Sequence, residues 1–267
     1  MRGRAAIDAG GLRQWVLLLR YSVLASDYDG TLALDGRVAA ATIDALRRFK
    51  EAEGRLILVT GRDRRDLQAH FPEFGLCDLI VAENGALLYD PATGDEQLLA
   101  PALPGRLVAE LRARGVTPIL PGRVIVSTRQ PYEREVAEAL AFLHLTCDLV
   151  FNKGAVMVVP PGTDKGAGLK AALARLCVDP ETVVAVGDAE NDHSLLAGVG
   201  LGVAVANALQ SLREEADLVL DKPATAGVEQ LIHMMLSGDP RLVTRHASIG
   251  EPVSELGAVS GENALGL

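Results

Sequence analysis

The chain has 267 residues, which is long enough for one large domain or two modest ones. Because 49% of the residues are apolar and only 4% are aromatic, the core must consist mostly of Ala, Val and Leu. Its formal charge of −9 argues against nucleic acid or an anionic membrane as a partner, because either would require a basic surface. An anionic substrate would therefore need local positive charge from a metal, a Lys or Arg side chain, or a helix N-terminus.

The cysteine content and the first residues bear on the compartment. The chain has three cysteines, Cys77, Cys147 and Cys177, and no Cys-x-x-Cys spacing. This cysteine usage favours a reducing compartment, so we expect a cytoplasmic protein with neither a disulfide framework nor a zinc site. Residues 1–19 have no clear period and are predicted to be an N-terminal extension. Their apolar run, 15–19, is too short for a signal-peptide core, and we expect no membrane span anywhere in the chain.

Residues 20–85 are predicted to begin an α/β domain. Uninterrupted apolar runs of the kind that parallel sheets bury predict strands, and the segments between them have helical spacing. The expected strands are 21–26, 56–59 and 78–82, and the expected helices are 39–53 and about 63–71. Strands alternating with helices imply right-handed crossovers and a doubly wound parallel sheet.

The pattern changes over residues 86–161, where prolines and glycines punctuate short apolar runs. We expect a small α+β domain inserted into the first one, with strands near 86–89, 97–99, 124–128, 148–151 and 155–159 and helices near 104–114 and 132–144. Asn152-Lys153-Gly154 is typical of a tight hairpin turn between the last two strands.

The α/β pattern resumes over residues 162–236, which are predicted to complete the first domain. Helices are expected at 164–176, near 208–215 and up to 236, with strands at 182–186, 201–205 and 218–220. Residues 237–267 are polar and without a period, and we expect a loose C-terminal tail.

Two carboxylates stand where the first predicted strand ends, in Ser26-Asp27-Tyr28-Asp29-Gly30. Ligands of open α/β sheets bind beyond the carboxyl ends of the strands. Two carboxylates so close repel each other unless a cation or a shared proton is present. The alternative is an ordinary acidic turn, since Asp and Gly favour turns.

Polar residues occupy matching positions at three further strand ends or helix starts: Thr60, Lys165, and the pair Asp188 and Asp192. Each has a structural alternative. Thr60 could cap the helix that follows it, Lys165 could be a solvated lysine, and the two aspartates could be a turn residue and an acid near a helix dipole. Four such coincidences on one edge of the sheet favour a functional site.

These residues together resemble the haloacid dehalogenase superfamily of phosphohydrolases, over residues 21 to about 236. The first motif of the family, D-x-D-G-T-L, stands at 27–32, the second is Thr60 in Thr-Gly-Arg, the third is Lys165, and the fourth, G-D-x-x-N-D, stands at 187–192. The insertion at 86–161 resembles the C2-type cap of the Cof-like branch. It is short for that branch and nearer to the archaeal type of phosphoglycolate phosphatase.

The resemblance implies a division of chemical roles. Asp27 is the expected nucleophile, which forms an aspartyl-phosphate, and Asp29 the expected acid and base. A Mg²⁺ ion is expected at Asp27, the Asp29 carbonyl and Asp188, with Asp192 near it. Residues expected to bind the phosphate are Thr60, Gly61 and Lys165.

Other polar residues are weaker candidates for contact with the substrate: Arg62, Asn84 and Asn191. For Arg62, a salt bridge to a local acid is an equal alternative. For three cations of the inserted region, a solvated position is the better expectation: Lys153, Arg123 and Arg129.

The sequence therefore predicts a Mg²⁺-dependent phosphatase of a small phosphorylated metabolite, with a phosphoglycolate-like acid slightly favoured over a sugar phosphate. A phospho-accepting receiver-like module and a non-catalytic binding protein are remote alternatives. The first lacks support because receivers have no inserted cap. The second lacks support because every motif residue that the chemistry requires is present.

Overall fold

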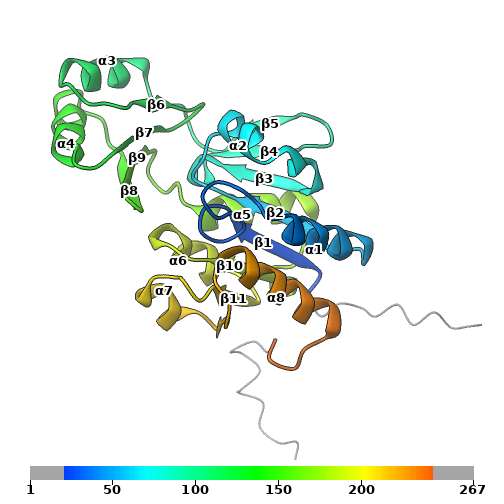
Figure 1. Ribbon diagram of the computed structural model, residues 1–267. Coiled ribbons are helices and arrows are strands. Elements are labelled where there is room, and N and C mark those ends of the chain that lie inside the picture. The colour runs from blue at the N-terminus through cyan, green and yellow to red at the C-terminus, as the bar shows by residue number, and fades with distance from the viewer. Residues whose placement is uncertain (1–20, 243–267) are drawn as a thin grey trace, which may run out of the picture.

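The computed structural model describes residues 21–242. Within them, the larger sheet contains six parallel strands, which extend inward from one of its edges: β1 (Val23–Asp27), β2 (Arg55–Val59), β3 (Leu79–Ala82), β10 (Val183–Gly187), β11 (Leu201–Ala204) and β12 (Leu218–Val219). Two antiparallel strands, β4 (Leu87–Tyr89) and β5 (Glu96–Leu98), continue it. The spatial order is β12-β11-β10-β1-β2-β3-β4-β5 (Figure 1). The predicted α/β class with a doubly wound sheet is confirmed.

Helices cover both faces of this sheet (Figure 1). On one face, α1 (Ala40–Glu51) packs against α8 (Ala224–Ser237), and on the other α5 (Lys165–Leu176) packs against α6 (His193–Ala197). Helix α1 buries Thr42, Ala45, Leu46 and Phe49, which recur at helical spacing on one side. Because both faces are covered, β1 and β10 are buried along their whole length.

A second, four-stranded antiparallel sheet lies apart from the first, as expected for the inserted cap (Figure 1). Its order is β6 (Leu120–Pro121), β7 (Val126–Arg129), β9 (Ala155–Val159) and β8 (Asp148–Asn152). Alternate residues of β9 point to opposite sides. Val158 joins a core with the helices α3 (Gly105–Ala113) and α4 (Glu133–Phe142), and Met157 joins a cluster with Ala86 of the larger domain.

The hairpin β4–β5 differs from the expectation. We expected strands near 86–89 and 97–99 within the inserted domain, whereas they pair onto β3 and extend the larger sheet. The cause is the short helical turn η2 (Glu83–Gly85), in which Asn84 and Gly85 have φ values of 55° and 102° and reverse the chain. The cap therefore branches from the sheet only after β5. Strand β6 was not expected at all.

The chain ends bear on two further expectations. The predicted extension at 1–19 and the tail from 243 onward lie outside the described residues. The first part of the predicted tail, 238–242, continues the fold: Gly238 ends α8 in the left-handed region, and Leu242 is buried in the main core. Within residues 21–242 no helix is long and apolar enough to cross a membrane.

The two remaining helices of the described residues are α2 (Arg64–His70) and α7 (Gln210–Glu215), and three further short helical turns are η1 (Pro72–Leu76), η3 (Pro180–Thr182) and η4 (Glu190–Asp192).

Candidate active site

The predicted site residues meet at one edge of the larger sheet. Strand β1 lies between β10 and β2 and runs parallel to both, so the three strands end at the same edge. Asp27 is the last residue of β1, Thr60 follows β2, and Asp188 follows β10. Residues far apart in the chain thus become neighbours because parallel strands share a direction.

A buried ion cluster stands at this edge. Lys165, whose side chain is fully buried, donates from Nζ to Asp27 Oδ1 at 2.5 Å and to Asp192 Oδ1 at 2.6 Å. The other carboxylate oxygen of Asp192 accepts the backbone N–H groups of Asp188 at 2.8 Å and Ala189 at 2.9 Å. Lys165 is therefore a central member of the cluster, and the alternative of a solvated lysine is wrong.

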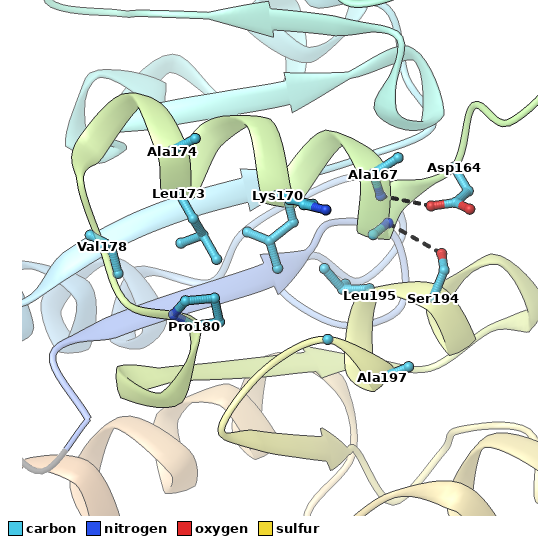
Figure 2. Close-up of a pocket in the computed structure, with 13 residues that line it drawn as sticks. Asp164, Ala167, Lys170, Leu173, Ala174, Val178, Pro180, Ser194, Leu195 and Ala197 are labelled. Atoms are coloured by element: carbon cyan, nitrogen blue, oxygen red, sulfur yellow. Dashed lines mark hydrogen bonds between the residues drawn. The ribbon is translucent and has the colours of Figure 1, made fainter.

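Three glycines allow α5 to bring Lys165 this close. A Cβ atom on Gly166 would lie 2.4 Å from the Ser194 carbonyl oxygen, and one on Gly168 would lie 2.6 Å from the Cα of Gly85. A Cβ on Gly85 would lie 1.9 Å from the carbonyl oxygen of Asp164. The Asp164 side chain caps the helix by accepting the Ala167 N–H, and Ser194 Oγ accepts the N–H of the first helical glycine (Figure 2).

The cluster carries more negative than positive charge. Burial, followed by the charge of Asp192, raises the pKa of Asp27 to about 7, although Lys165 acts in the opposite direction. Burial disfavours the charge of Lys165, but Asp192 and Asp27 outweigh it and raise the pKa of the lysine above its usual value. Burial also raises the pKa of Asp188. A further cation at this place would relieve the excess charge.

One carboxylate oxygen from each of Asp27, Asp188 and Asp192 lies within 4.8 Å of the other two, and all three residues are buried. Carboxylate and carbonyl oxygens are the ligands that Mg²⁺ prefers in proteins. The donor set and its unbalanced charge therefore fit the predicted divalent cation. Both oxygens of Asp192 accept hydrogen bonds, from Lys165 and from the backbone N–H groups of Asp188 and Ala189, so this residue also holds the cluster together.

Asp29 lies beside the cluster with its carboxylate turned to Arg62. Arg62 Nε donates to Asp29 Oδ2 and Nη2 donates to Asp29 Oδ1, both at 2.7 Å. Arg62 Nη1 also donates to Asp66 Oδ2 at 2.5 Å. The alternative that Arg62 forms a salt bridge with local acids is thus confirmed, and one of those acids is Asp29 itself.

Asp188 is held by residues that the sequence analysis did not place in the site. Thr31 Oγ1 donates to Asp188 Oδ1 at 3.1 Å, and Lys153 Nζ donates to Asp188 Oδ2 at 2.5 Å. Asn207 Nδ2 donates to the Gly30 carbonyl at 2.9 Å and lies 3.4 Å from Asp188 Oδ2. Asn207 follows shortly after β11, so its position near a strand end was the signal that could have identified it.

Lys153 is 45% exposed, as expected for a solvated position, but its ammonium group reaches from the cap into the acidic cluster, which was not expected. The two arginines considered with it remain outside the cluster. Arg123 is 59% exposed and lies 3.7 Å from Glu96, and Arg129 is exposed at the end of β7.

Thr60 is fully buried, and its Oγ1 accepts the N–H of Arg62 at 3.1 Å. The helix that follows is capped by Asp63, whose side chain accepts the N–H groups of Arg65 and Asp66. The alternative of Thr60 as a helix cap is therefore wrong. Gly61 stands beside Thr60, and a Cβ there would lie 3.9 Å from Asn191 Nδ2.

Asn84 and Asn191 form a buried pair next to Gly61. Asn191 Nδ2 donates to Asn84 Oδ1 at 2.9 Å. The other two polar atoms of the pair, Asn84 Nδ2 and Asn191 Oδ1, are buried without a protein partner. Such a group is costly to bury unless a ligand or water satisfies it.

A cavity of about 380 Å³ opens between the sheet edge and the cap. Asp27 and Asp29 line it from the larger domain, and Ser127, Asn152 and Met157 line it from the cap. A larger cavity of about 670 Å³ lies between α5 and α6, where Leu169, Leu173 and Val178 make it mainly apolar (Figure 2). The larger cavity includes none of the cluster carboxylates, so the smaller one is the candidate substrate site.

Comparison with known proteins places this geometry in a family. The model of the haloacid dehalogenase-like hydrolases matches residues 24–113 and 125–232. A phosphoglycolate phosphatase of Methanothermobacter thermautotrophicus is 30% identical over 222 residues, which cover 80% of this chain and 98% of the relative. A phosphoglycolate phosphatase of Halorubrum lacusprofundi is 33% identical over 224 residues, covering 77% of this chain and 94% of the relative.

Solved structures share the fold at lower identity. A protein of Thermoplasma acidophilum has a TM-score of 0.70 at 16% identity and covers 81% of this chain and 98% of its own. A haloacid dehalogenase-like hydrolase of Bacteroides thetaiotaomicron has a TM-score of 0.67 at 20% identity, with coverage of 80% and 99%. A subclass IIB sugar phosphatase has a TM-score of 0.65 at 22% identity, with coverage of 81% and 99%.

Proposed function

Because the chain belongs to the haloacid dehalogenase-like hydrolases and is an enzyme of the phosphatase class, we propose that it hydrolyses a small phosphorylated metabolite with Mg²⁺ through an aspartyl-phosphate intermediate. One observation carries this proposal. The Asp27 carboxylate is buried at the tip of β1, bonded to Lys165 and next to a cavity that the cap closes from the other side.

The chemistry proceeds in two displacements at phosphorus. Asp27 attacks the phosphoryl group, the bond to the leaving alkoxide breaks, and Asp29 protonates that alkoxide. Water then attacks the aspartyl-phosphate while Asp29 removes its proton, so that inorganic phosphate leaves and Asp27 is regenerated. Asp29 lines the same cavity as Asp27, which suits a group that must reach both the alkoxide and the water.

Mg²⁺ bound by Asp27, Asp188 and the Asp29 carbonyl supplies positive charge that favours the ionised nucleophile and the developing charge on the phosphoryl oxygens. Asp192 supports these ligands indirectly. Its two oxygens hold Lys165 and the backbone at Asp188, and it thereby fixes the positions of both.

Positive charge and hydrogen bonds around Asp27 would bind the phosphate. Lys165 is placed to neutralise negative charge that builds in the transition state. Thr60 and Gly61 lie at the neighbouring strand end. The unpartnered Asn84 Nδ2 lies in the same region and offers a donor, so we extend the proposed phosphate site to this residue.

A phosphoglycolate-like acid is the first candidate substrate, because relatives of about 30% identity over nearly their whole length are named phosphoglycolate phosphatases. A sugar phosphate is the second candidate, and the lining of the cavity favours it. Arg62 is the single Lys or Arg among its described lining residues, and Asp29 and Asp66 already occupy that side chain. Ser127, Thr128 and Asn152 offer hydrogen bonds that suit hydroxyl groups.

The test is phosphate release from phosphoglycolate, several hexose phosphates and an aryl phosphate, with Mg²⁺ and with chelator, using wild type and Asp27→Asn. We expect metal-dependent release that Asp27→Asn abolishes, and acid-quenched wild type should carry label from ³²P-substrate on Asp27. Release that survives in Asp27→Asn would contradict the covalent mechanism. The ranking of phosphoglycolate against the hexose phosphates decides between the two substrate classes.

A further inference from the structure

Lys153 makes a contact that joins the cap to the acidic cluster of the larger domain. Its Nζ donates to the Asp29 carbonyl oxygen at 2.8 Å and to Asp188 Oδ2 at 2.5 Å. The Asp188 side chain is 2% exposed, whereas that of Lys153 is 45% exposed. The lysine therefore enters the cluster from its solvent-exposed side, and its ammonium bonds two oxygens that belong to the other domain.

The backbone on both sides is shaped for this contact. Lys153 and Gly154 have φ values of 47° and 84°, so they form the tight turn that joins β8 to β9 and extends toward the cluster. On the opposite side, a Cβ atom on Gly30 would lie 2.2 Å from Lys153 Nζ and 2.5 Å from Asp188 Oδ2. Only glycine at this position leaves room for the ammonium group.

The two oxygens that Lys153 bonds are among those assigned above to the divalent cation. Mg²⁺ lies about 2.1 Å from its oxygen ligands and demands near-octahedral geometry. An ammonium group within hydrogen-bond distance of the same two oxygens would occupy the space of that ion and repel its charge. The lysine and the metal therefore cannot hold the Asp29 carbonyl and Asp188 at the same time.

We propose that Lys153 competes with the divalent cation for these two oxygens, and so holds the cap against the larger domain until the metal displaces it. The inference rests on the proposed function, because it uses the metal site assigned there. Metal binding and docking of the hairpin β8–β9 through Lys153 are then one coupled equilibrium, and each weakens the other by the same factor.

The test is Mn²⁺ affinity, measured by electron paramagnetic resonance of the free ion, for wild type, Lys153→Gln and Arg134→Gln. Arg134 is the matched control, because it is a cap cation whose side chain is 80% exposed on α4 and bonds only neighbouring acids. If the lysine is bonded in about nine-tenths of the metal-free molecules, Lys153→Gln should bind Mn²⁺ roughly tenfold more tightly. Arg134→Gln should bind as wild type does.

Hydrogen exchange distinguishes displacement of Lys153 by the metal from the alternative that the charge of Lys153 only repels the metal. In wild type, Mg²⁺ should accelerate amide exchange in residues 148–159, because the hairpin is released. In Lys153→Gln this segment should exchange fast with and without Mg²⁺. An exchange pattern in wild type that Mg²⁺ leaves unchanged would overturn the proposal even if the affinities differed.

The Mn²⁺ affinities distinguish failure of the competition by Lys153 from failure of the proposed metal site. Equal or weaker Mn²⁺ binding by Lys153→Gln, with binding to wild type that Asp188→Asn abolishes, overturns the competition and leaves the metal site standing. No binding to wild type or to either cap variant overturns both the competition and the metal dependence of the proposed function.

Discussion

Arg62 and Asp29 form a two-pronged ion pair in which Nε and Nη2 each donate to a different carboxylate oxygen at 2.7 Å. The guanidinium is held in turn by Asp66 and lies 5.3 Å from the ring centre of Tyr28. The orientation of the proposed acid and base is therefore set by a residue from the neighbouring strand end. Substitutions that break this fork should act through Asp29.

Arg62→Lys keeps the charge but cannot form two parallel hydrogen bonds, so the carboxylate of Asp29 loses its fixed orientation. We expect kcat to fall about tenfold, because a misplaced acid contributes only part of its effect, with a smaller change in KM. Arg65→Lys is the control, since Arg65 is exposed on α2 and its substitution should leave kcat unchanged. Wild-type kcat in Arg62→Lys would show that the fork does not position Asp29.

Asp29→Asn removes the proposed proton donor but keeps the shape of the side chain. The rate with alkyl phosphates should fall by about 10²–10⁴, because an alkoxide leaves poorly without a proton. The first step with aryl phosphates bearing good leaving groups should be affected much less. Single-turnover rates across a leaving-group series measure this difference, and equal losses along the series would contradict the acid role.

Asp27 makes the stability of the metal-free protein depend on pH. Its pKa in the folded state is about 7, above the unfolded value of about 3.9, so the folded state binds the proton more tightly between these values. Its contribution to the free energy of unfolding is therefore lost as pH rises from about 4 to about 7.

Asp27→Asn removes this contribution. Urea denaturation in chelator should show the variant to be more stable than wild type by more than about 1 kcal/mol at pH 7.5, with the difference shrinking toward pH 4. A difference that stays constant over this range would mean that Asp27 does not titrate there.

Lys165→Met leaves two buried carboxylates, Asp27 and Asp192, without their shared cation. The metal-free protein should lose about 3–5 kcal/mol of unfolding free energy, because an uncompensated buried charge remains. Saturating Mg²⁺ should restore part of the loss, since a ligand that binds only the folded state stabilises it. Lys170→Met, on the exposed side of the same helix, should change the stability by less than about 0.5 kcal/mol.

If Mg²⁺ stabilised wild type and Lys165→Met equally, the cation would not share the charge of this cluster. That outcome would place metal binding elsewhere in the protein.

A comparison of Gly85 with Gly94 separates the cost of a steric clash from the cost of a positive φ value. Both have positive φ values, 102° and 80°, but a Cβ on Gly85 would meet the Asp164 carbonyl, whereas a Cβ on Gly94 would meet nothing within 4 Å. We expect Gly94→Ala to cost about 1 kcal/mol, as for other residues forced to positive φ. Gly85→Ala should cost at least about 2 kcal/mol more and lower kcat, because it displaces the start of α5 and thus Lys165. Thermal unfolding and steady-state kinetics measure both, and equal costs would exclude the close approach.

The sequence by itself determined the parallel strands of the larger sheet and the main members of the cluster. Apolar runs predicted β1, β2 and β10. A polar residue directly after such a run marks the end of a strand, and this does not depend on the conformation of the loops. Because parallel strands end at one edge, Asp27, Thr60 and Asp188 could be expected together from their places in the sequence. The tight turn at Asn152-Lys153-Gly154 was also predicted, since Asn and Gly favour hairpin turns.

The tertiary structure alone decided which long side chains enter the site. Lys153 Nζ bonds the Asp29 carbonyl across 124 positions of sequence, and Arg62 turns to Asp29 across 33. The pattern of a single segment carries no information on where another domain places its hairpin, so Lys153 was expected in solvent. The hairpin β4–β5 joined the larger sheet for the same reason: the unpaired edge of β3 was available to it, and edge pairing depends on geometry between segments rather than on their own residues.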